Sequence, residues 1–570
     1  MSQTKHKVQW ILRESPHGWE RLLPSDMPPI LGRLLAQRGV SKEGVDRFLR
    51  PRLAQLSNPF EIPEVDLAVE RIFRAIDRQE KVCIFGDYDV DGVSSIAVLR
   101  STLEAYGLQP HSFIPRRSSE GYGLSEAGLK RCLKQCGRPD LLISVDCGTV
   151  SNDAIATLKK TGVDTVVVDH HEIGPEGRPD CVALVNPKAS GDPRQYLCAA
   201  GVVFKLAHAL LKKRPLDDFD LKSALDLVAV ATVSDIVPLV EENRLLVRHG
   251  LRILENSNRP GLQALLKLTG TEGRISSSDI GFRIGPRLNA AGRMDQPEQA
   301  LATLMTDCRH EAIDLAEELE RFNRCRQQLE QTIFAEAMAL LKDREDDPVI
   351  VVGSRSWHAG VVGIVASRLM RMYHKPVFVI SIDDGGVGKG SGRSIAGVSL
   401  VEAIRACRHH LLAGGGHHMA AGLSIREELI EPFRHDFIRF VRETCRAEDL
   451  TPKVYVDAEV KLADLSLDFL SSYELLQPFG SANPQPVFMA REVWLSESPK
   501  KLKNNHLRLF LRQGYDERCA IFFGGGAYDL PDPPWDIAFT VDRNVFRGRT
   551  SIQISIQKVR AAESDSHEAR

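Results

Sequence analysis

Acidic and histidine side chains follow short apolar runs at three places in this sequence. Five carboxylates and two imidazoles stand there: Asp87, Asp89 and Asp91 after VCIF, Asp146 after LLISV, and Asp169, His170 and His171 after TVVV. Carboxylates gathered in one pocket repel one another and are costly to bury, so a cation must lie among them. Oxygen-rich ligand sets with one or two imidazoles suit Mn²⁺ or Mg²⁺ better than Zn²⁺. Two such ions, about 3.5–4 Å apart, form a common arrangement for hydrolysing phosphate esters.

The elements that carry these residues predict an α/β fold in which the residues meet. The runs KVCIFGDYD, LLISVDCG, DTVVVDHH and VALVNPK are typical of buried strands, and helical segments lie between them. Strands joined by crossover helices form a parallel sheet, and the carboxyl ends of its strands open onto one crevice. We therefore expect a doubly wound parallel sheet with the acids at one edge. Asp235, in the helical stretch AVATVSDIVPL, is expected beside them.

Two simpler interpretations compete with a metal site. A single aspartate at a strand end is more often a turn former or a helix cap than a ligand. Three coincident strand ends favour the metal site over that interpretation. GDYDVDG also resembles a calcium-binding loop, but position 12 counted from Asp87 is Val98 rather than a glutamate.

Other patterns along the chain predict several domains. The 570 residues favour three or four domains at about 150 residues each. The expected parts are a helical N-terminal region at 1–75, a catalytic α/β domain at 76–255, a helical connector at 256–345, a second α/β domain at 346–448, a barrel or sandwich of five or six short strands at 449–560, and a tail at 561–570. Within the connector, 296–342 is expected to form one long helix or a helical hairpin.

Composition limits the classes of protein that fit. Hydrophobic residues make up 43% and charged residues 26%, which excludes a wholly disordered, collagen-like or coiled-coil chain. The 74 lysine and arginine residues nearly balance 76 aspartate and glutamate residues, so any polyanion must be held locally. No long apolar run or signal peptide is visible, so we expect a cytoplasmic protein without membrane contact. The 11 cysteines include no CxxC pair, which disfavours zinc fingers and a disulfide framework.

Taken together, the motifs resemble those of a known superfamily. GDYDVDG, SVDCG, DHH and ATVSDIVPL resemble, in order and spacing, the four motifs of the DHH phosphoesterase superfamily. GPRLNAAGRMD, WHAGVVGIVASRL, GKGSGRSIAGVSL, GGGHHMAAG and LLQPFGSANPQPVF resemble strings of its RecJ family, bacterial exonucleases specific for single-stranded DNA, over about residues 30–560. The resemblance implies a DHH-type domain, a long connecting helix, a DHH-associated domain and a C-terminal OB-fold β-barrel. It also implies 5′-to-3′ hydrolysis of single-stranded DNA to mononucleotides with two Mn²⁺ or Mg²⁺ ions, in DNA repair and recombination.

The same resemblance implies roles for the acids and histidines. The implied metal ligands are Asp89, Asp91, Asp146, His170 and Asp235. Asp87 is implied to be a further ligand or to lie directly behind the ligands, and His171 to face the scissile phosphate. The pyrophosphatase branch of the superfamily has a histidine four residues before Asp89, where this chain has Phe85, and that departure disfavours a pyrophosphatase.

The second α/β domain is expected to bind phosphate groups of the substrate. GGVGKGSGRS is not a P-loop, because Asp383 takes the first glycine position and Gly390 follows Lys389. Ser391 and Arg393 can grip an anionic oxygen, and Gly414–Gly416 with His417 can form an amide nest before a helix. The glycines would alternatively make only a tight turn. Resemblance to the DHH-associated domain favours substrate binding, with Gly415, Gly416 and His417 in contact.

Arginines near the domain junction are candidates for holding a terminal phosphate. Arg287, Asn289 and Arg293 lie in GPRLNAAGRMD, and Arg326 lies in the long helical stretch. A planar guanidinium matches a phosphate with two hydrogen bonds, so one or more of these arginines could recognise a 5′-phosphate. An arginine on a long helix is usually only solvated, which is the simpler interpretation of Arg326.

The β-rich C-terminal domain is expected to bind single-stranded DNA through a basic groove and stacked aromatic rings. The candidate residues are Lys500, Lys501, Lys503, Arg508, Arg543, Arg547 and Arg549 with Phe522, Phe523, Tyr528 and Phe546. Single lysines usually only solubilise a surface, and alternate aromatic residues in strands usually lie in the core. By family resemblance we also expect a single-strand-binding protein and a helicase as partners, and a monomer.

Two other functions are open. One is a nanoRNase or cyclic-dinucleotide phosphodiesterase of the same superfamily, whose members are typically shorter and lack the OB domain. The other is a non-catalytic scaffold, as in eukaryotic replication factors that share this fold but have lost ligands. Every ligand position is filled here, which favours an enzyme.

Overall fold

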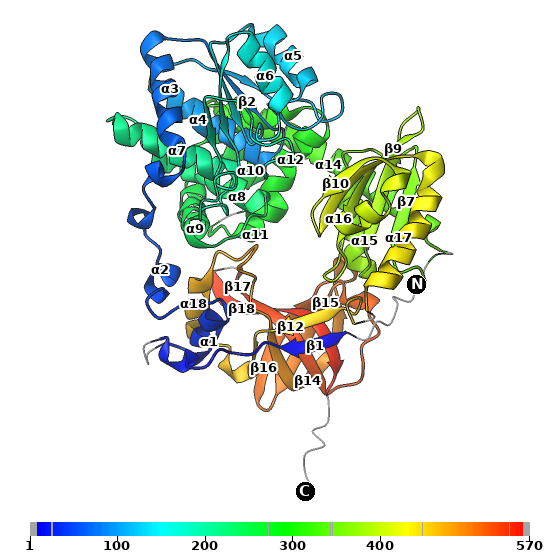
Figure 1. Ribbon diagram of the computed structural model, residues 1–570. Helices are drawn as coiled ribbons and strands as arrows, with labels where there is room; N and C mark the ends of the chain where they lie inside the picture. Colours follow the sequence, from blue (N-terminus) through cyan, green and yellow to red (C-terminus); the bar gives the residue numbers. More distant parts are fainter. Residues whose placement is uncertain are drawn as a thin grey trace. The chain divides into compact units, whose positions relative to one another are not determined.

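The computed structural model describes residues 8–23, 27–271, 273–342, 344, 346–446, 448–546 and 548–562 (Figure 1). Contacts divide the chain into two units. One unit comprises Leu53–Leu450 with Gly480–Ala482, and the other comprises Met1–Arg52, Thr451–Phe479 and Asn483–Arg570. Each unit is described by itself below.

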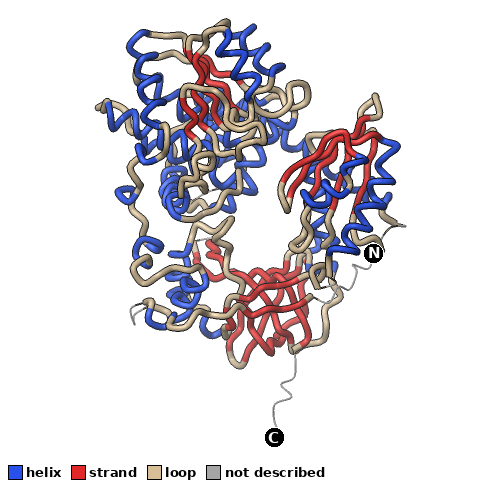
Figure 2. Tube along the Cα trace, viewed as in Figure 1, coloured by secondary structure: helices blue, strands red, loops and turns tan. Residues whose placement is uncertain are grey.

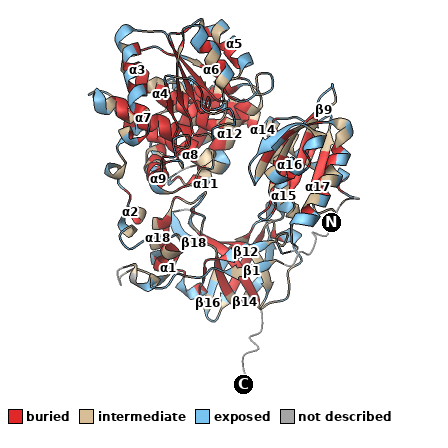
Figure 3. Cartoon of the chain, in the orientation of Figure 1, coloured by how far each residue is buried: buried red, intermediate tan, exposed pale blue. Residues whose placement is uncertain are grey.

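The first unit contains a parallel sheet with the strand order β3-β2-β4-β5-β6. Its strands are β2 (Val82–Gly86), β3 (His111–Phe113), β4 (Leu141–Val145), β5 (Asp164–Val168) and β6 (Ala183–Val185). The strands are almost wholly buried, as expected of a parallel sheet that helices cover on both faces (Figure 3). The predicted doubly wound sheet is confirmed.

Helices on the two faces of this sheet pack against alternate residues of its strands. Val82 and Ile84 share a core with α3 (Val65–Arg78), α4 (Val90–Ala105) and α7 (Ala199–Lys213). Cys83 and Phe85 share another core with α5 (Glu126–Cys136) and α6 (Asn152–Lys160). The side chains alternate because successive residues of a strand point to opposite faces.

A helical region follows the sheet. It contains α8 (Leu225–Ser234), α9 (Glu241–Glu255), α10 (Pro260–Leu268), α11 (Ser277–Asp279), α12 (Gly285–Arg293), α13 (Pro297–Met305) and α14 (Arg309–Leu340). The stretch predicted as one long helix or a hairpin is interrupted between α13 and α14, where the Thr306 hydroxyl accepts the Cys308 amide at 3.1 Å. α14 is 32 residues long. Leu319 packs in the core of the first sheet, and Ile333 packs in that of the second.

The second sheet of this unit is mixed, with the strand order β10-β11-β9-β8-β7. β7 (Ile350–Ser354) and β8 (Val377–Ile382) are parallel. β9 (Val387–Arg393) is antiparallel to β8, β11 (Ala420–Arg426) is antiparallel to β9, and β10 (Leu411–Gly416) is antiparallel to β11. Three helices pack on this sheet: α15 (Val362–Tyr373), α16 (Leu400–Ala406) and α17 (Ile430–Thr444). Figure 2 shows the strands of both sheets against their helices.

The expectation of an amide nest before a helix at Gly414–Gly416 is wrong. These glycines end β10, and the chain turns directly into β11, with the His417 amide donating to the Ala420 carbonyl at 2.8 Å. The run forms a hairpin because its backbone groups pair with β11, whose residues alternate between buried and exposed in its second half.

The other unit contains a closed β-barrel. Its strands are β14 (Phe488–Lys501), β15 (Leu507–Gln513), β16 (Asp516–Phe522), β17 (Trp535–Phe546) and β18 (Arg549–Ala561), and pairing of β14 with β17 closes the ring. The short strand β13 (Ala458–Glu459) pairs in parallel with the start of β14. The predicted C-terminal barrel is confirmed.

Residues 8–52 lie in the same unit as the barrel. Helices α1 (Pro29–Gln37) and α2 (Val45–Leu49) share its core with α18 (Leu467–Tyr473). The sequence predicted only helices in this region, but β1 (Gln9–Leu12) is a strand that pairs with β12 (Lys453–Val456). Four residues are too few to show a strand periodicity, and their partner lies more than 400 positions away. Among the described residues, no helix combines the length and the apolarity that crossing a membrane requires.

Candidate active site

The acids that follow the strands of the first sheet converge at its carboxyl edge. Asp87 follows β2, Asp146 follows β4, and Asp89 caps the N-terminus of α4. Carboxylate oxygens of these three residues all lie within 4.8 Å of one another. This group is the first of two overlapping ligand groups.

The second group surrounds His170. Its Nε2 atom lies 3.3 Å from Asp146 Oδ1, 3.8 Å from Asp91 Oδ2 and 3.7 Å from Asp235 Oδ2. Asp235 is at the C-terminal end of α8, which brings it beside the sheet as expected. Because Asp146 belongs to one group and contacts the centre of the other, the two groups adjoin.

Backbone amides hold two of these carboxylates in place. Asp89 Oδ1 accepts hydrogen bonds from the amides of Asp91 at 2.9 Å and Gly92 at 3.2 Å, which is the usual bonding of a helix N-cap. Asp91 accepts from the amides of Ala199 at 2.7 Å and Ala200 at 2.8 Å, at the start of α7. Two helix N-termini therefore face the acidic site, and their positive ends favour its negative charge.

Two backbone features show how tightly the site is built. A Cβ atom on Gly92 would lie 2.4 Å from the Asp87 carbonyl oxygen, so the strand-to-helix turn requires glycine there. Asp146 has a φ of 60°, a left-handed conformation that costs a non-glycine residue energy. The amide of Asp146 donates to the Val168 carbonyl at 3.0 Å, which helps to hold this conformation.

The electrostatics of the site require cations. Burial and the Asp89 charge raise the pKa of Asp87, and burial and Asp91 raise that of Asp146. Burial and neighbouring carboxylates raise the pKa of Asp91 to about 6 and that of Asp235 to about 8. Burial, with the nearby His171, lowers the pKa of His170 to about 3, so His170 is neutral and can act as a ligand.

The donor set fits Mn²⁺ or Mg²⁺. Asp87 is fully buried, and among the described residues its Oδ2 atom has no hydrogen-bond partner. A buried carboxylate oxygen without a partner is costly unless a cation binds it. Five carboxylates and one neutral imidazole form an oxygen-rich set in two adjoining groups, as two hard divalent cations would need.

His171 lies beside the ligand groups in a hydrogen-bonded chain of its own. Its Nδ1 atom is 2.7 Å from Asp169 Oδ1, and its Nε2 atom is 2.7 Å from the Tyr122 hydroxyl. Burial alone would lower the pKa of His171, but the hydrogen bond and charge of Asp169 raise it to about 9. Asp169 also accepts from the Thr149 amide at 3.0 Å, so it positions His171 from a fixed place. His171 is therefore a cation at neutral pH.

The motif GPRLNAAGRMD packs against the first acidic loop. Asn289 Oδ1 accepts from the Val90 amide at 3.2 Å, at the start of α4. A Cβ atom on Gly292 would lie 2.4 Å from the Tyr88 carbonyl oxygen, so α12 can approach the loop only with glycine there. Asn289, which was predicted to bind substrate, thus holds the start of α4 beside the acidic loop.

Three arginines from different elements meet next to the acids. Arg293 ends α12 and Arg393 ends β9, and the charge of Arg117 acts on both. Burial, with Arg117 and Arg326, lowers the pKa of Arg293 to about 10, and burial lowers that of Arg393. Within the described part of the chain, none of the three forms an ion pair with a carboxylate. Half-buried guanidinium groups without a carboxylate partner are suited to an anionic ligand.

The N-terminus of α15 adjoins this basic cluster. Arg293 Nη1 donates to the Gly360 carbonyl at 2.8 Å, just before the helix. A Cβ atom on Gly363 would lie 2.8 Å from Ser391 Oγ, and Arg393 Nη1 lies 3.2 Å from the same hydroxyl. Ser391 and Arg393 therefore lie together at a helix N-terminus, where phosphate groups commonly bind.

Two of the predicted arginines are already paired with acids. Arg287 Nε is 2.7 Å from Glu320 Oε2, and Arg326 Nη1 is 2.8 Å from Glu330 Oε2. Arg326 also donates to Asn323 Oδ1 at 2.8 Å. Each must exchange an existing ion pair to bind phosphate, which makes them weaker candidates than Arg293 and Arg393.

Gly415, Gly416 and His417 are exposed at the end of the second sheet where β9 also ends. The register pairs Gly392 with Ala421 and Ala421 with Gly416. Neighbouring strands lie about 4.8 Å apart, so Gly416 is about 10 Å from Gly392. The three residues thus lie at the same end of the sheet as Ser391 and Arg393, two strands away from them.

In the barrel, the predicted DNA-binding residues fall into different classes. Phe522 lies in the core rather than on a binding surface, and Arg543 is paired with Glu474 at 2.8 Å. Lys500 is paired with Glu497 at 2.7 Å and lies over the Phe510 ring. The exposed candidates are Lys501, Lys503, Arg508, Phe523, Tyr528 and Arg549. Arg547 and the side chain of Phe546 lie outside the described residues.

Sequence reasoning missed three components: Tyr122, Arg117 and the N-terminus of α15. Tyr122 and Arg117 lie in the long segment between β3 and α5, where no periodicity marks a functional side chain. The glycines of WHAGVVG were visible as a signal for close backbone approach before a helix.

Comparisons with known proteins agree with this geometry. A model of the DHH family, N-terminal domain, matches residues 81–232, a model of the DHHA1 domain matches 346–443, and a model of the RecJ OB domain matches 456–558. The single-stranded-DNA-specific exonuclease RecJ of Bacillus subtilis is 35% identical over 98% of this chain and 71% of its own length. The protein of the same name from Salmonella typhimurium is 33% identical over 94% of this chain and 96% of its own length.

A solved structure extends the similarity to the whole fold. The crystal structure of RecJ from Thermus thermophilus in complex with Mn²⁺ matches with a TM-score of 0.83 and 30% identity. The match covers 98% of this chain and 80% of that one. A structure of the same protein in complex with Mg²⁺ matches with a TM-score of 0.79.

Proposed function

This chain belongs to the RecJ family of single-stranded-DNA-specific exonucleases, and from that membership we propose that it shortens single-stranded DNA from the 5′ end to mononucleotides. The enzyme is a phosphodiesterase of the DHH family that uses Mn²⁺ or Mg²⁺, with a role in DNA repair and recombination. The polarity and the role of each residue are the proposed parts.

One observation supports the proposed chemistry above all: two ligand groups adjoin, and one of them contains a buried carboxylate oxygen, Asp87 Oδ2, that has no partner among the described residues. Asp89, Asp91, Asp146, His170 and Asp235 would hold two divalent cations, with Asp87 contributing its free oxygen. When bound, these cations supply Lewis-acid chemistry toward a phosphodiester.

His171 contributes a positive charge and a proton at Nε2. Its raised pKa keeps the ring protonated at neutral pH, and Asp169 fixes Nδ1. The ring thereby directs Nε2 toward the Tyr122 hydroxyl, on the side of the ligand groups. We assign His171 to a non-bridging oxygen of the scissile phosphate, where a cation stabilises the charge that develops during hydrolysis. Tyr122 is a positioning residue that acts through His171.

The basic cluster would bind the terminal phosphate. Arg293, Arg393 and Ser391 lie at the N-terminus of α15, and the charge of Asp89 acts on Arg293, so the cluster borders the acidic site. With the terminal phosphate bound there, the next phosphodiester of the strand would lie at the ligand groups. Gly415, Gly416 and His417 would contact the strand further along, and Arg287 and Arg326 would contribute after exchanging their acid partners.

The OB domain supports binding of single-stranded DNA. Lys501, Lys503, Arg508 and Arg549 are exposed on it, as are the rings of Phe523 and Tyr528. Basic side chains that follow a backbone, with aromatic rings for base stacking, are the usual means by which OB-folds bind single strands.

A time course on end-labelled single-stranded DNA tests the polarity. With a 5′ label, we expect the label to appear at once as a mononucleotide. With a 3′ label, we expect a ladder of steadily shorter products. Early release of the 3′ label as a mononucleotide would overturn the proposed direction.

The same assay separates the remaining alternatives. A dinucleotide phosphodiesterase would prefer dinucleotides to long strands, whereas we expect long strands to be hydrolysed faster. A blunt duplex should resist, because we propose that the site admits one strand. Rapid digestion of the duplex without a helicase would contradict that idea.

Further features of the enzyme are also proposals, some from family resemblance and some from sequence patterns. They are a single-strand-binding protein and a helicase as partners, a monomeric state, a cytoplasmic location and the six domain limits given above. Size-exclusion chromatography with light scattering tests the monomer, and co-purification with a purified single-strand-binding protein tests the first partner.

A further inference from the structure

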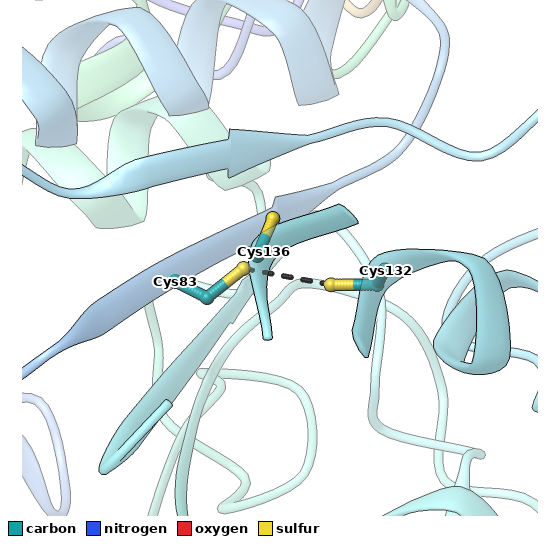
Figure 4. A group of neighbouring side chains, drawn as sticks. All are labelled: Cys83, Cys132 and Cys136. Carbon is teal, nitrogen blue, oxygen red and sulfur yellow. Dashed lines mark hydrogen bonds between the residues drawn. The ribbon is translucent and has the colours of Figure 1, made fainter. Parts of the chain in front are cut away.

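Three cysteine thiols meet on the first sheet, away from the acids. The Sγ atoms of Cys83, Cys132 and Cys136 all lie within 4.8 Å of one another, and those of Cys83 and Cys132 are 3.5 Å apart (Figure 4). All three cysteines are free. The roles proposed above for the nuclease do not use them.

Two elements bring the thiols together. Cys83 is the second residue of β2 and points to the face that α5 covers. Cys132 and Cys136 are four residues apart on α5, so they project from the same side of that helix. A ligand that bound all three sulfur atoms would join the strand to the helix.

The surroundings differ from those of ordinary core cysteines. Cys83 and Cys132 are fully buried, whereas Cys136 reaches the rim of the core. Lys81 places positive charge beside Cys136, and its ammonium lies 2.9 Å from where a Cβ atom of Gly137 would be.

Simple packing does not require this arrangement. A buried cysteine behaves as a small apolar residue with a weak S–H donor, so three such residues gain little by turning their sulfur atoms toward one another. A thiolate is a soft ligand that selects soft or borderline cations such as Zn²⁺. The Lys81 ammonium at the rim also reduces the cost of the negative charge that three thiolates leave on a divalent cation.

We propose that Cys83, Cys132 and Cys136 form a second metal site, which binds a thiophilic divalent cation of the Zn²⁺ type through three thiolates. Water or His111 would be the fourth ligand of the tetrahedral site. His111 lies on β3, opposite Cys83 in the pairing of β3 with β2. Each thiol that is still protonated releases one proton when its sulfur atom binds the cation. The site differs in kind from the acidic one, whose ligands are oxygen atoms and an imidazole.

Cobalt titration of the full-length enzyme tests the proposal. The protein is kept reduced with a phosphine under oxygen-free conditions, and excess Mg²⁺ fills the acidic site because Mg²⁺ does not compete for thiolates. We expect added Co²⁺ to produce sulfur-to-metal charge-transfer absorption that saturates at one equivalent and disappears when Zn²⁺ is added. Absence of this absorption would overturn the proposal.

Cysteine variants locate the site. Cys136→Ser, at the rim of the core, should lower Zn²⁺ affinity by at least about tenfold and weaken the cobalt absorption. Cys132→Ser should do the same, and Cys136→Ser decides the question if Cys132→Ser fails to fold. Cys181→Ser is the matched control, a half-buried cysteine beside the same core, and should leave Zn²⁺ affinity unchanged.

Hydrolysis of single-stranded DNA with Mg²⁺ reports that each variant is folded. Because the cysteines are not part of the catalytic machinery, Cys136→Ser should retain this activity while it loses Zn²⁺ affinity. A Cys136→Ser enzyme that is active and binds Zn²⁺ as tightly as the parent would refute the site.

Discussion

The two sheets of residues 53–450 carry functional side chains in different ways. The first sheet is wholly parallel, and its acids stand in the turns that follow its strands. The second is mixed, and Ser391 and Arg393 lie within the strand β9 itself. The first presents buried negative charge, and the second contributes positive charge and hydroxyl groups.

This difference follows from backbone chemistry. At the carboxyl edge of a parallel sheet several strands end together, so acids distant in sequence converge on one point. In antiparallel strands, residues of neighbouring strands lie directly opposite one another, so functional side chains can stand within the strands themselves. We infer that the first sheet performs hydrolysis and the second holds the strand, and four changes test that division.

Asp146→Asn should have the largest effect. It removes a carboxylate that contacts both ligand groups, and we expect turnover of single-stranded DNA to fall by about 10²–10³-fold or more. Burial and Asp91 raise the pKa of Asp146, so the metal-free variant should melt no lower than the parent. Asp153→Asn, an exposed acid on α6, is the control and should leave turnover unchanged. Near-normal turnover in Asp146→Asn would remove the first sheet from the chemistry.

Arg393→Ala should act on binding rather than on hydrolysis. A charge-assisted hydrogen bond contributes about 1.5–3 kcal/mol, so kcat/KM on 5′-phosphorylated oligonucleotides should fall by about 10–100-fold. Oligonucleotides with a 5′-hydroxyl should be affected much less. Arg355→Ala, which breaks the ion pair with Glu427 in the same domain, is the control. An equal loss on both kinds of substrate would argue against a terminal phosphate at Arg393.

Tyr122→Phe should have a smaller effect, confined to turnover. The change removes the hydroxyl 2.7 Å from His171 Nε2, and a neutral hydrogen bond contributes about 0.5–1.5 kcal/mol, so kcat should fall by about 2–10-fold. KM should stay constant, and the alkaline limb of the pH–rate profile should shift, because Tyr122 acts through His171. Tyr515→Phe, on an exposed ring of the barrel, provides the comparison. A change in KM alone would place Tyr122 among the binding residues.

The effect of Mn²⁺ on melting temperature should depend on pH. The folded pKa values of about 6 for Asp91 and about 8 for Asp235 exceed the ordinary carboxyl value, so the metal-free protein loses stability as the pH rises from about 4 to 8. Bound Mn²⁺ offsets the repulsion that causes this loss. We expect the Mn²⁺-induced rise in Tm to be at least about 2 °C larger at pH 8 than at pH 6, measured by calorimetry. Equal rises at both pH values would contradict the acidic site as the place of binding.

The sequence was most informative where acidic residues directly follow a strand pattern. Asp87, Asp146 and Asp169 stand directly after buried strands, so strand prediction alone brought them together. Asp235 was found through its motif and lies 3.7 Å from His170. The short strands of the C-terminal domain predicted a barrel or a sandwich, and the family resemblance favoured the barrel that the structure shows.

Features that depend on long-range packing were not predictable in the same way. Tyr122 reaches His171 from a segment without periodicity, and the ion pair of Arg287 with Glu320 joins two helices. The glycine run Gly414–Gly416 was assigned to a nest because glycine permits many conformations, and pairing with β11 selects the strand. Local propensity cannot reveal a partner strand.

Helix α14 sets the spacing between the two sheets. Leu319 is anchored in one core and Ile333 in the other, with uninterrupted helix between them. A single residue inserted between these anchors would turn one core by about 100° and advance it by about 1.5 Å relative to the other. Insertions in this segment should therefore uncouple phosphate capture from bond cleavage while each half stays folded, whereas loops elsewhere tolerate length changes.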